Sequence, residues 1–173
     1  MLPRGPGGHF PYTGSPPPLG PIVTDIYVDA DACPVKDEVY RVAQRYGLKV
    51  LLVSNTWLRA PNEDWLEVVV VGAELDAADA WIVEHVTQDD IVVTADIPLA
   101  ALCLEKGTSV LGPRGRPFTE DSIGGALATR ELMSQLREMG EVSGGPPPFE
   151  KRDRSRFLQA LDRMIHAIRK WPR

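Results

Sequence analysis

Five short apolar runs, separated by segments with helical spacing, constrain the fold of this chain most. They occupy residues 26–28, 48–54, 66–71, 91–94 and 110–111. Their valine- and isoleucine-rich, nearly continuous hydrophobicity is typical of strands covered on both faces of a parallel sheet. Strands that alternate with helices predict an α/β fold: a three-layer parallel sheet of about five strands, order 3-2-1-4-5, with helices on both faces.

Helices are expected at residues 35–46, 75–86, 98–106, 119–139 and 153–170. Their apolar residues recur every three or four positions, which places them on one helix face. Pro34 and Pro98 suit the first turn of a helix, and Gly47 and Gly107 suit the position after its end. Residues 144–148 are expected to form a rigid linker before the last helix.

Length and composition limit the domain organisation. At 173 residues and 43% hydrophobic content, residues 22–173 are expected to form one domain. Residues 1–21 contain seven Pro and five Gly, so we expect a disordered extension there. No apolar run approaches a membrane span and no signal peptide is apparent, which favours a cytoplasmic protein. Cys33 and Cys103 lack the spacing of a zinc site and are interpreted as buried apolar residues.

Aspartates follow two of the predicted strands. Asp29 and Asp31 come after the first strand and Asp96 after the fourth, while Asp76 and Asp79 share one face of the intervening helix. In a 3-2-1-4-5 sheet the first and fourth strands are neighbours, so these carboxylates meet at the edge where ligands bind. Such hard oxygen ligands suit Mg²⁺ or Mn²⁺.

The local charge supports a cation at this edge. Residues 62–96 contain ten Asp and Glu but no Lys or Arg, so converging carboxylates have no local side chain to neutralise them. A plainer interpretation remains open for each residue, in which Asp96 caps the following helix and Asp79 is solvated. The tryptophans Trp57, Trp65 and Trp81 are interpreted as packing residues rather than base-stacking platforms.

Basic residues collect elsewhere in the chain. Residues 150–173 carry eight Lys and Arg against three Asp and Glu, whereas residues 1–149 sum to −10. Arg114 and Arg116 follow the fifth strand, at the same sheet edge as the carboxylates, and Arg154 opens the last helix. We expect these three arginines to contact phosphates of a nucleic acid, with ordinary surface charge as the alternative.

Several sequence motifs resemble those of one known family. The segment IVVTADIPLAALCLEKG from Ile91 is similar to the Thr-x-Asp strand-to-helix signature of PIN-like nucleases, and DAWIV from Asp79 precedes it at a similar distance. Together with VDADACPVK, GAELDAAD, PRG and GGPPPF, the chain from about Asp25 to Ile168 resembles the YaiI/YqxD family of uncharacterised bacterial proteins, which is grouped with the PIN-like fold.

This resemblance implies a PIN-like fold and a metal-dependent nuclease that hydrolyses RNA phosphodiesters. It implies Asp29, Asp79 and Asp96 as ligands of Mg²⁺ or Mn²⁺, with Asp31 and Asp76 supporting catalysis. PIN nucleases commonly carry a glutamate on the helix before the third strand, where residues 55–65 of this chain offer only Glu63 and Asp64.

Two other functions remain open. Asp-x-Asp at the end of the first strand also begins the motif of haloacid-dehalogenase-type phosphatases, in which Asp29 would be a nucleophile and Asp31 a general acid. However, Pro34 starts the helix sooner than that fold requires. The third interpretation is a non-catalytic RNA-binding module that uses the basic last helix, with the acidic residues as a structural metal site, and the absence of the usual glutamate favours it.

Overall fold

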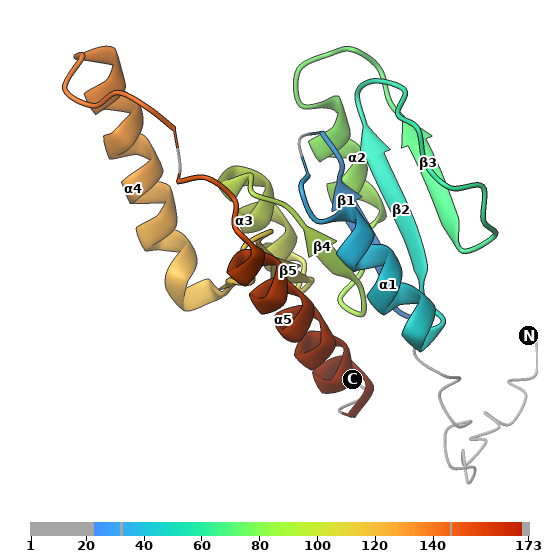
Figure 1. The fold of residues 1–173 in the computed structure, drawn as a ribbon. Coiled ribbons are helices and arrows are strands. Elements are labelled where there is room, and N and C mark those ends of the chain that lie inside the picture. The colour runs from blue at the N-terminus through green and yellow to red at the C-terminus, as the bar shows by residue number, and fades with distance from the viewer. Residues whose placement is uncertain (1–22, 32, 146, 171–173) are drawn as a thin grey trace, which may run out of the picture.

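One sheet of six strands organises the protein (Figure 1). The computed structural model describes residues 23–170 except residues 32 and 146. The strands are β1 (Asp25–Asp29), β2 (Lys49–Ser54), β3 (Leu66–Val70), β4 (Ile91–Val93), β5 (Ser109–Leu111) and β6 (Pro117–Phe118). Their order is β3-β2-β1-β4-β5-β6, with the first five parallel and β6 antiparallel to β5. The predicted order is confirmed, and the predicted extension at residues 1–21 lies outside the described residues.

The described residues form five helices, as the sequence predicts: three connect strands and two follow β6. They are α1 (Lys36–Tyr46), α2 (Ala77–His85), α3 (Ile97–Glu105), α4 (Glu120–Glu138) and α5 (Lys151–Lys170). Figure 1 shows α1 and α5 on one side of the sheet, with α2 and α3 on the other. No helix within the described part of the chain is long and apolar enough to cross a membrane.

The helix ends follow from the residues that flank them. Gly47 ends α1 with a φ of 65°, a left-handed conformation that glycine adopts without strain. Asp96 begins α3, where its Oδ1 accepts a hydrogen bond from the backbone N–H of Leu99 at 2.9 Å. Thr119 and Ser122 form a reciprocal capping box at the start of α4. One glycine and a few short polar side chains therefore determine where α1 ends and where α3 and α4 begin.

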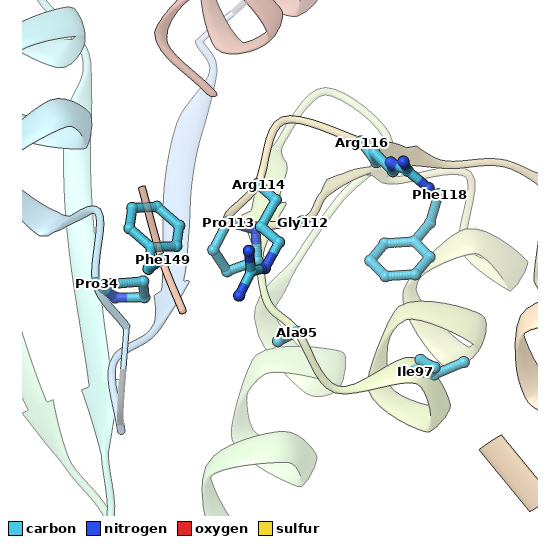
Figure 2. A pocket seen from close by; sticks show the side chains of 9 residues that line it. All are labelled: Pro34, Ala95, Ile97, Gly112, Pro113, Arg114, Arg116, Phe118 and Phe149. Atoms are coloured by element: carbon cyan, nitrogen blue, oxygen red, sulfur yellow. The ribbon is translucent and has the colours of Figure 1, made fainter. Parts of the chain in front are cut away.

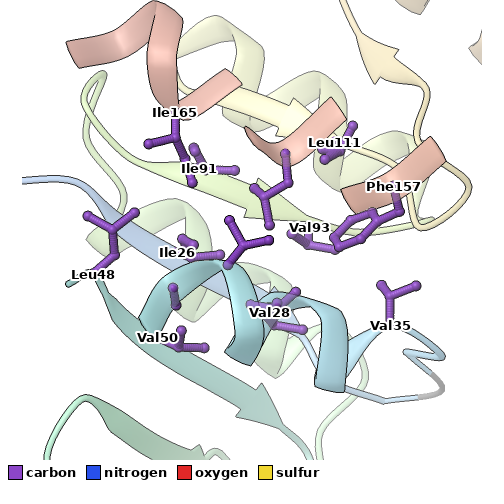
Figure 3. Close-up of a cluster of buried hydrophobic side chains, with 14 of the residues drawn as sticks. Ile26, Val28, Val35, Leu48, Val50, Ile91, Val93, Leu111, Phe157 and Ile165 are labelled. Atoms are coloured by element: carbon purple, nitrogen blue, oxygen red, sulfur yellow. The ribbon is translucent and has the colours of Figure 1, made fainter. Parts of the chain in front are cut away.

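Two apolar cores cover the two faces of the sheet. On one face, Phe157, Leu161 and Ile165 of α5 pack with α1 and with inward side chains of the strands (Figure 3). On the other face, Ile82 of α2 and Leu99 of α3 pack against alternate residues of the same strands. All five of these side chains are fully buried. The three-layer arrangement is thus confirmed, and the carboxyl ends of β1 and β4 lie between the two helical layers.

The tryptophans divide into two groups. Trp65 contacts Tyr40 and Trp81 contacts Tyr27, with ring centroids 5.7 and 6.1 Å apart, which confirms the packing interpretation for both. The same interpretation of Trp57 is wrong, because its side chain is 76% exposed in the connection after β2. Trp57 and Trp65 lie in the same connection between β2 and β3, and no local pattern distinguishes them, since burial depends on the course of that connection.

α4 differs from the other helices because none of its residues is buried. Figure 1 shows it extending away from the sheet, with α3 as its neighbour. The helix therefore contributes little to the two cores.

Candidate active site

The site is built where the sheet reverses its strand order. β1 connects through α1 to β2 on one side, while its other neighbour is β4, with Val28 paired to Val93. Asp29 ends β1, and Thr94 follows directly after β4. The buried Thr94 hydroxyl donates a hydrogen bond to Asp29 Oδ2 at 2.9 Å. A side-chain hydrogen bond thus joins the carboxyl ends of the two strands.

Asp96 is held by the same threonine. Its backbone N–H donates to Thr94 Oγ1 at 2.9 Å, while its own Oδ1 accepts from the N–H of Leu99. The capping role considered for Asp96 is therefore confirmed, and it fixes the carboxyl group at the edge of the sheet. One turn of chain thereby positions Asp29 and Asp96 relative to each other.

Asp31 lies nearer β2. Its Oδ1 accepts a hydrogen bond from Ser54 Oγ at 2.6 Å and its Oδ2 accepts from the N–H of Asn55 at 3.1 Å. Asp31 therefore ties the loop after β1 to the end of β2. The side-chain oxygen Oδ1 of Asn55 is buried and has no hydrogen-bond partner among the described residues.

Asp79 completes the group from the first turn of α2. Burial, followed by the charges of Asp96, Asp29 and Asp76, raises its pKa from 3.8 to about 6. Asp76 itself is exposed, precedes α2 and has a left-handed φ of 65°. Asp76 thus acts on Asp79 through its charge.

Asp29 shows the same electrostatic coupling. Burial is the main cause of its raised pKa; the hydrogen bond from Thr94 opposes the rise, and the charges of Asp96 and Asp31 add to it. Asp29, Asp79 and Asp96, here called the acidic cluster, therefore lie close enough to repel one another. No ion pair between described residues involves any of the three.

The donors of the acidic cluster fit a hard divalent cation in their chemistry. Carboxylate oxygens are the usual ligands of Mg²⁺ and Mn²⁺, and the unpartnered Oδ1 of Asn55 adds a further buried oxygen at the same edge. Within the described residues, however, no three His, Cys, Asp or Glu side chains are arranged as a ready-made metal site. Metal binding by Asp29, Asp79 and Asp96 stays a prediction.

Arg114, predicted to contact phosphates, has partners within the protein. Its guanidinium donates to Asp153 Oδ2 at 3.1 Å and to the carbonyl oxygen of Pro147, and it lies 5.5 Å from the ring centre of Phe149. Asp153 is buried at the start of α5. Arg114 therefore holds the segment before α5 against the loop after β5.

Arg154 and Arg116 differ in whether their side chains have partners within the protein. Arg154 donates to the carbonyl oxygen of Pro34 at 2.8 Å and to Glu38 Oε1 at 3.1 Å, which joins α5 to the start of α1. Arg116 is exposed, and its side chain has no hydrogen bond or ion pair with another described residue. Of the three predicted arginines, Arg116 has the side chain most available to a ligand, and nucleic-acid binding stays a prediction for all three.

Two residues that bind the aspartates were not among the predicted site residues. Thr94 and Ser54 bind Asp29 and Asp31 through their hydroxyls. Each is the single polar residue at the carboxyl end of an apolar strand, and each is fully or nearly fully buried. A hydroxyl in that position, next to a strand that ends in aspartate, is the signal that identifies them.

Comparison with known proteins places the sequence within one group. The family model described as "Uncharacterized BCR, YaiI/YqxD family" matches residues 27–167. A UPF0178 protein of Paramagnetospirillum magneticum is 56% identical over 148 residues, which cover 86% of this chain and 98% of that protein. A UPF0178 protein of Parvibaculum lavamentivorans is 57% identical over 150 residues, 87% of this chain and 99% of that protein. No solved structure gives a significant match.

Proposed function

The chain belongs to the YaiI/YqxD family, and we propose that it is a metal-dependent nuclease that hydrolyses phosphodiester bonds of RNA. The observation that carries this proposal is that Asp29, Asp79 and Asp96 lie together without a neighbouring cationic side chain among the described residues. Burial, and after it the repulsion among the carboxylates, raises the pKa of Asp29 and Asp79. An arrangement that is unfavourable for the protein alone becomes favourable when a divalent cation binds it.

The residues of the cluster have separate tasks in this proposal. Asp29, Asp79 and Asp96 would hold the cation, and Thr94 orients Asp29. When bound, Mg²⁺ or Mn²⁺ supplies Lewis acidity, which activates water and offsets charge on the phosphate. Asp31 and Asp76 add negative charge around the cluster and thereby strengthen its attraction for a cation.

The reaction transfers a phosphoryl group from one oxygen to another. The oxygen of a water forms a bond to phosphorus, the bond between phosphorus and the ribose oxygen breaks, and the departing oxygen gains a proton. The proton that the attacking water loses passes to solvent or to a carboxylate other than the three ligands, since a carboxylate that holds a cation has its pKa lowered by that charge.

Two exposed side chains support RNA as the substrate. Arg116 offers a positive charge after β5, and Trp57 offers an indole ring after β2. Both connections leave the carboxyl edge of the sheet, on opposite sides of β1 and β4. Single-stranded RNA is bound by such a combination of cations and aromatic rings, since its bases are free to stack.

The proposal is tested by incubating the purified protein with a 5′-labelled single-stranded RNA in Mn²⁺, in Mg²⁺ and in EDTA. We expect cleavage only with metal, and a loss of about a hundredfold or more in Asp29→Asn. Asp64→Asn is the matched control, because Asp64 is exposed and precedes β3, at the opposite edge of the sheet. Cleavage by Asp29→Asn at the wild-type rate would contradict the proposal.

The same assay separates the two alternatives. A phosphatase of the haloacid-dehalogenase type would release phosphate from a 5′-phosphorylated RNA without shortening the strand, whereas a binding module would retain the RNA intact. Either outcome, with metal present and the wild-type protein folded, would replace the nuclease assignment.

A further inference from the structure

A pocket of about 510 Å³ opens beside the acidic cluster (Figure 2). Its apolar walls come from Pro34, Ile97, Pro113, Phe118 and Phe149. Ala95 also lines it, between Thr94 and Asp96 of the site. A ligand in the pocket would therefore lie one residue away from two groups of the candidate active site. Its volume is within the range of small-molecule sites, which are usually about 300–1,000 Å³.

The walls of the pocket are held in place without a ligand. Gly115 has a φ of 88°, and a Cβ atom there would come within 2.6 Å of the backbone of Arg156, so the loop after β5 lies directly against α5. The N–H of Gly112 donates to the carbonyl oxygen of Arg116 at 2.9 Å, which closes the turn. The pocket is thus preformed, and this lowers the entropic cost of binding.

The opposite wall is equally fixed. Two guanidinium groups lie over the ring of Phe149, that of Arg114 at 5.5 Å and that of Arg154 at 5.0 Å from the ring centre. Figure 2 shows Phe149 and Pro34 on one side of the pocket, with Phe118 and Ile97 on the other. In Figure 2, Pro113 and Arg114 lie between these two sides, so each aromatic ring offers its own apolar surface for a flat group.

The charges around the pocket indicate which charged groups its ligand would carry. Arg116 lines the pocket and has no ion pair with another residue of the described chain, whereas Arg114 is already paired with Asp153. The acidic cluster on the far side of Ala95 is negative. A ligand with a flat ring, one phosphate near Arg116 and another near a cation at the cluster matches this distribution.

We propose that the pocket binds one nucleobase of single-stranded RNA. This base belongs to the nucleotide whose phosphodiester lies at the acidic cluster. The base stacks on Phe118, which Figure 2 shows on the same side of the pocket as Ile97, and Arg116 contacts the phosphate on the other side of the ribose. This assignment of the scissile nucleotide rests on the proposed nuclease function, whereas nucleotide binding by the pocket does not require catalysis. The pocket would then determine which base precedes or follows the cut.

The test measures binding of uridine and adenosine 5′-monophosphates in EDTA, by calorimetry or ligand-observed NMR. Ile97→Trp fills the pocket, and Ala95→Leu fills it from an exposed position that tolerates substitution. We expect each to weaken nucleotide binding by about tenfold, the effect of losing one stacked base. Leu102→Trp, on the exposed side of the same helix, is the control and should bind like the wild type.

Arg116→Gln tests the phosphate contact. It should weaken binding of the monophosphate severalfold without changing binding of the unphosphorylated nucleoside, whereas Arg130→Gln on α4 should change neither. An acidic peptide or an aromatic carboxylate that displaces the nucleotide and binds more tightly would assign the pocket to another ligand and overturn the proposal.

The outcomes for the pocket and for catalysis are separable. Two results would overturn the pocket proposal and leave the nuclease proposal intact. One is RNA cleavage at the wild-type rate and base preference in both pocket-filling variants. The other is failure of the wild type to bind any mononucleotide. Pocket-dependent nucleotide binding without RNA cleavage in any metal supports the pocket and refutes the nuclease. A changed base preference at the cut site in Ile97→Trp, with Leu102→Trp unchanged, supports both.

Discussion

Thr94 donates a hydrogen bond from its buried hydroxyl to Asp29 Oδ2 over 2.9 Å, and thereby links the carboxyl ends of β4 and β1. The same hydroxyl accepts the N–H of Asp96. One threonine thus positions two of the three carboxylates that we propose as metal ligands.

Replacing Thr94 with Val should weaken both the fold and the site. Valine has nearly the same shape but leaves the Asp29 carboxylate and the Asp96 N–H without their partner. We expect the free energy of unfolding, measured in urea, to fall by roughly 1–3 kcal/mol. Thr94→Ser keeps the hydroxyl and should lose less stability. If the valine variant were as stable as the wild type, this hydrogen bond would make no net contribution to folding.

The stability of the metal-free protein should depend on Asp79 in a pH-dependent manner. Its folded pKa is raised to about 6 from 3.8, so the folded state holds this proton more tightly than the unfolded chain. Stability therefore falls as pH rises through this window and stays lower above it. In EDTA, Asp79→Asn should raise the melting temperature near pH 7.5 and change it little near pH 4.

Asp64→Asn provides the reference for that experiment, because it removes an exposed carboxylate at the opposite edge of the sheet. The electrostatic account of Asp79 would be refuted if both variants changed the melting temperature equally at neutral pH.

Arg114 is expected to contribute to stability more than to ligand binding. Its removal leaves the buried Asp153 carboxylate with only one hydrogen-bond donor among the described residues, the N–H of Glu150 at 2.9 Å. Arg114→Ala should lower the free energy of unfolding by roughly 1–3 kcal/mol. Arg116→Ala, at an exposed position without such a partner, should stay within about 0.5 kcal/mol of wild type. Thermal denaturation that ranks the two arginines in the reverse order would disprove this division of roles.

Trp57 is expected to bind RNA without supporting the fold. Its side chain is 76% exposed in the connection that follows Ser54 and Asn55, both of which donate hydrogen bonds to Asp31. Trp57→Ala should weaken binding of single-stranded RNA by about five- to tenfold or more, measured in Ca²⁺ to limit cleavage, with an unchanged melting temperature. Leu132→Ala, which removes an exposed apolar side chain from α4, should leave RNA affinity unchanged. Equal affinities for both variants would make Trp57 an ordinary surface residue.

The architecture was predictable because its signals are local and repeated. Valine-rich runs that alternate with helical segments leave few topologies, and the order β3-β2-β1-β4-β5 follows from them. The same order predicted that Asp29 and Asp96 would lie at one edge, and their mutual charge effect agrees with this. β6 was missed because a strand of two residues carries no periodicity.

Contacts between distant residues were not predictable in the same way. Arg114 pairs with Asp153 across 39 positions and Arg154 with Glu38 across 116, so no spacing in the sequence indicates that either arginine has an internal partner. The exposure of Trp57 depends on the course of a loop rather than on its composition. The pocket between Phe118 and Phe149 likewise requires four separate connections to be placed in space.

The central claim is that Asp29, Asp79 and Asp96 form one cation site. Calorimetric titration of the metal-free protein with Mn²⁺ tests this claim most directly. Asp96→Asn is the decisive variant, because asparagine can still accept the N–H of Leu99 and cap α3 while it removes the charge. We expect saturable Mn²⁺ binding in the wild type and in Asp64→Asn, and at least about tenfold weaker binding in Asp29→Asn and Asp96→Asn. Wild-type affinity in both of these variants, or no Mn²⁺ binding by the folded wild-type protein, would contradict the account.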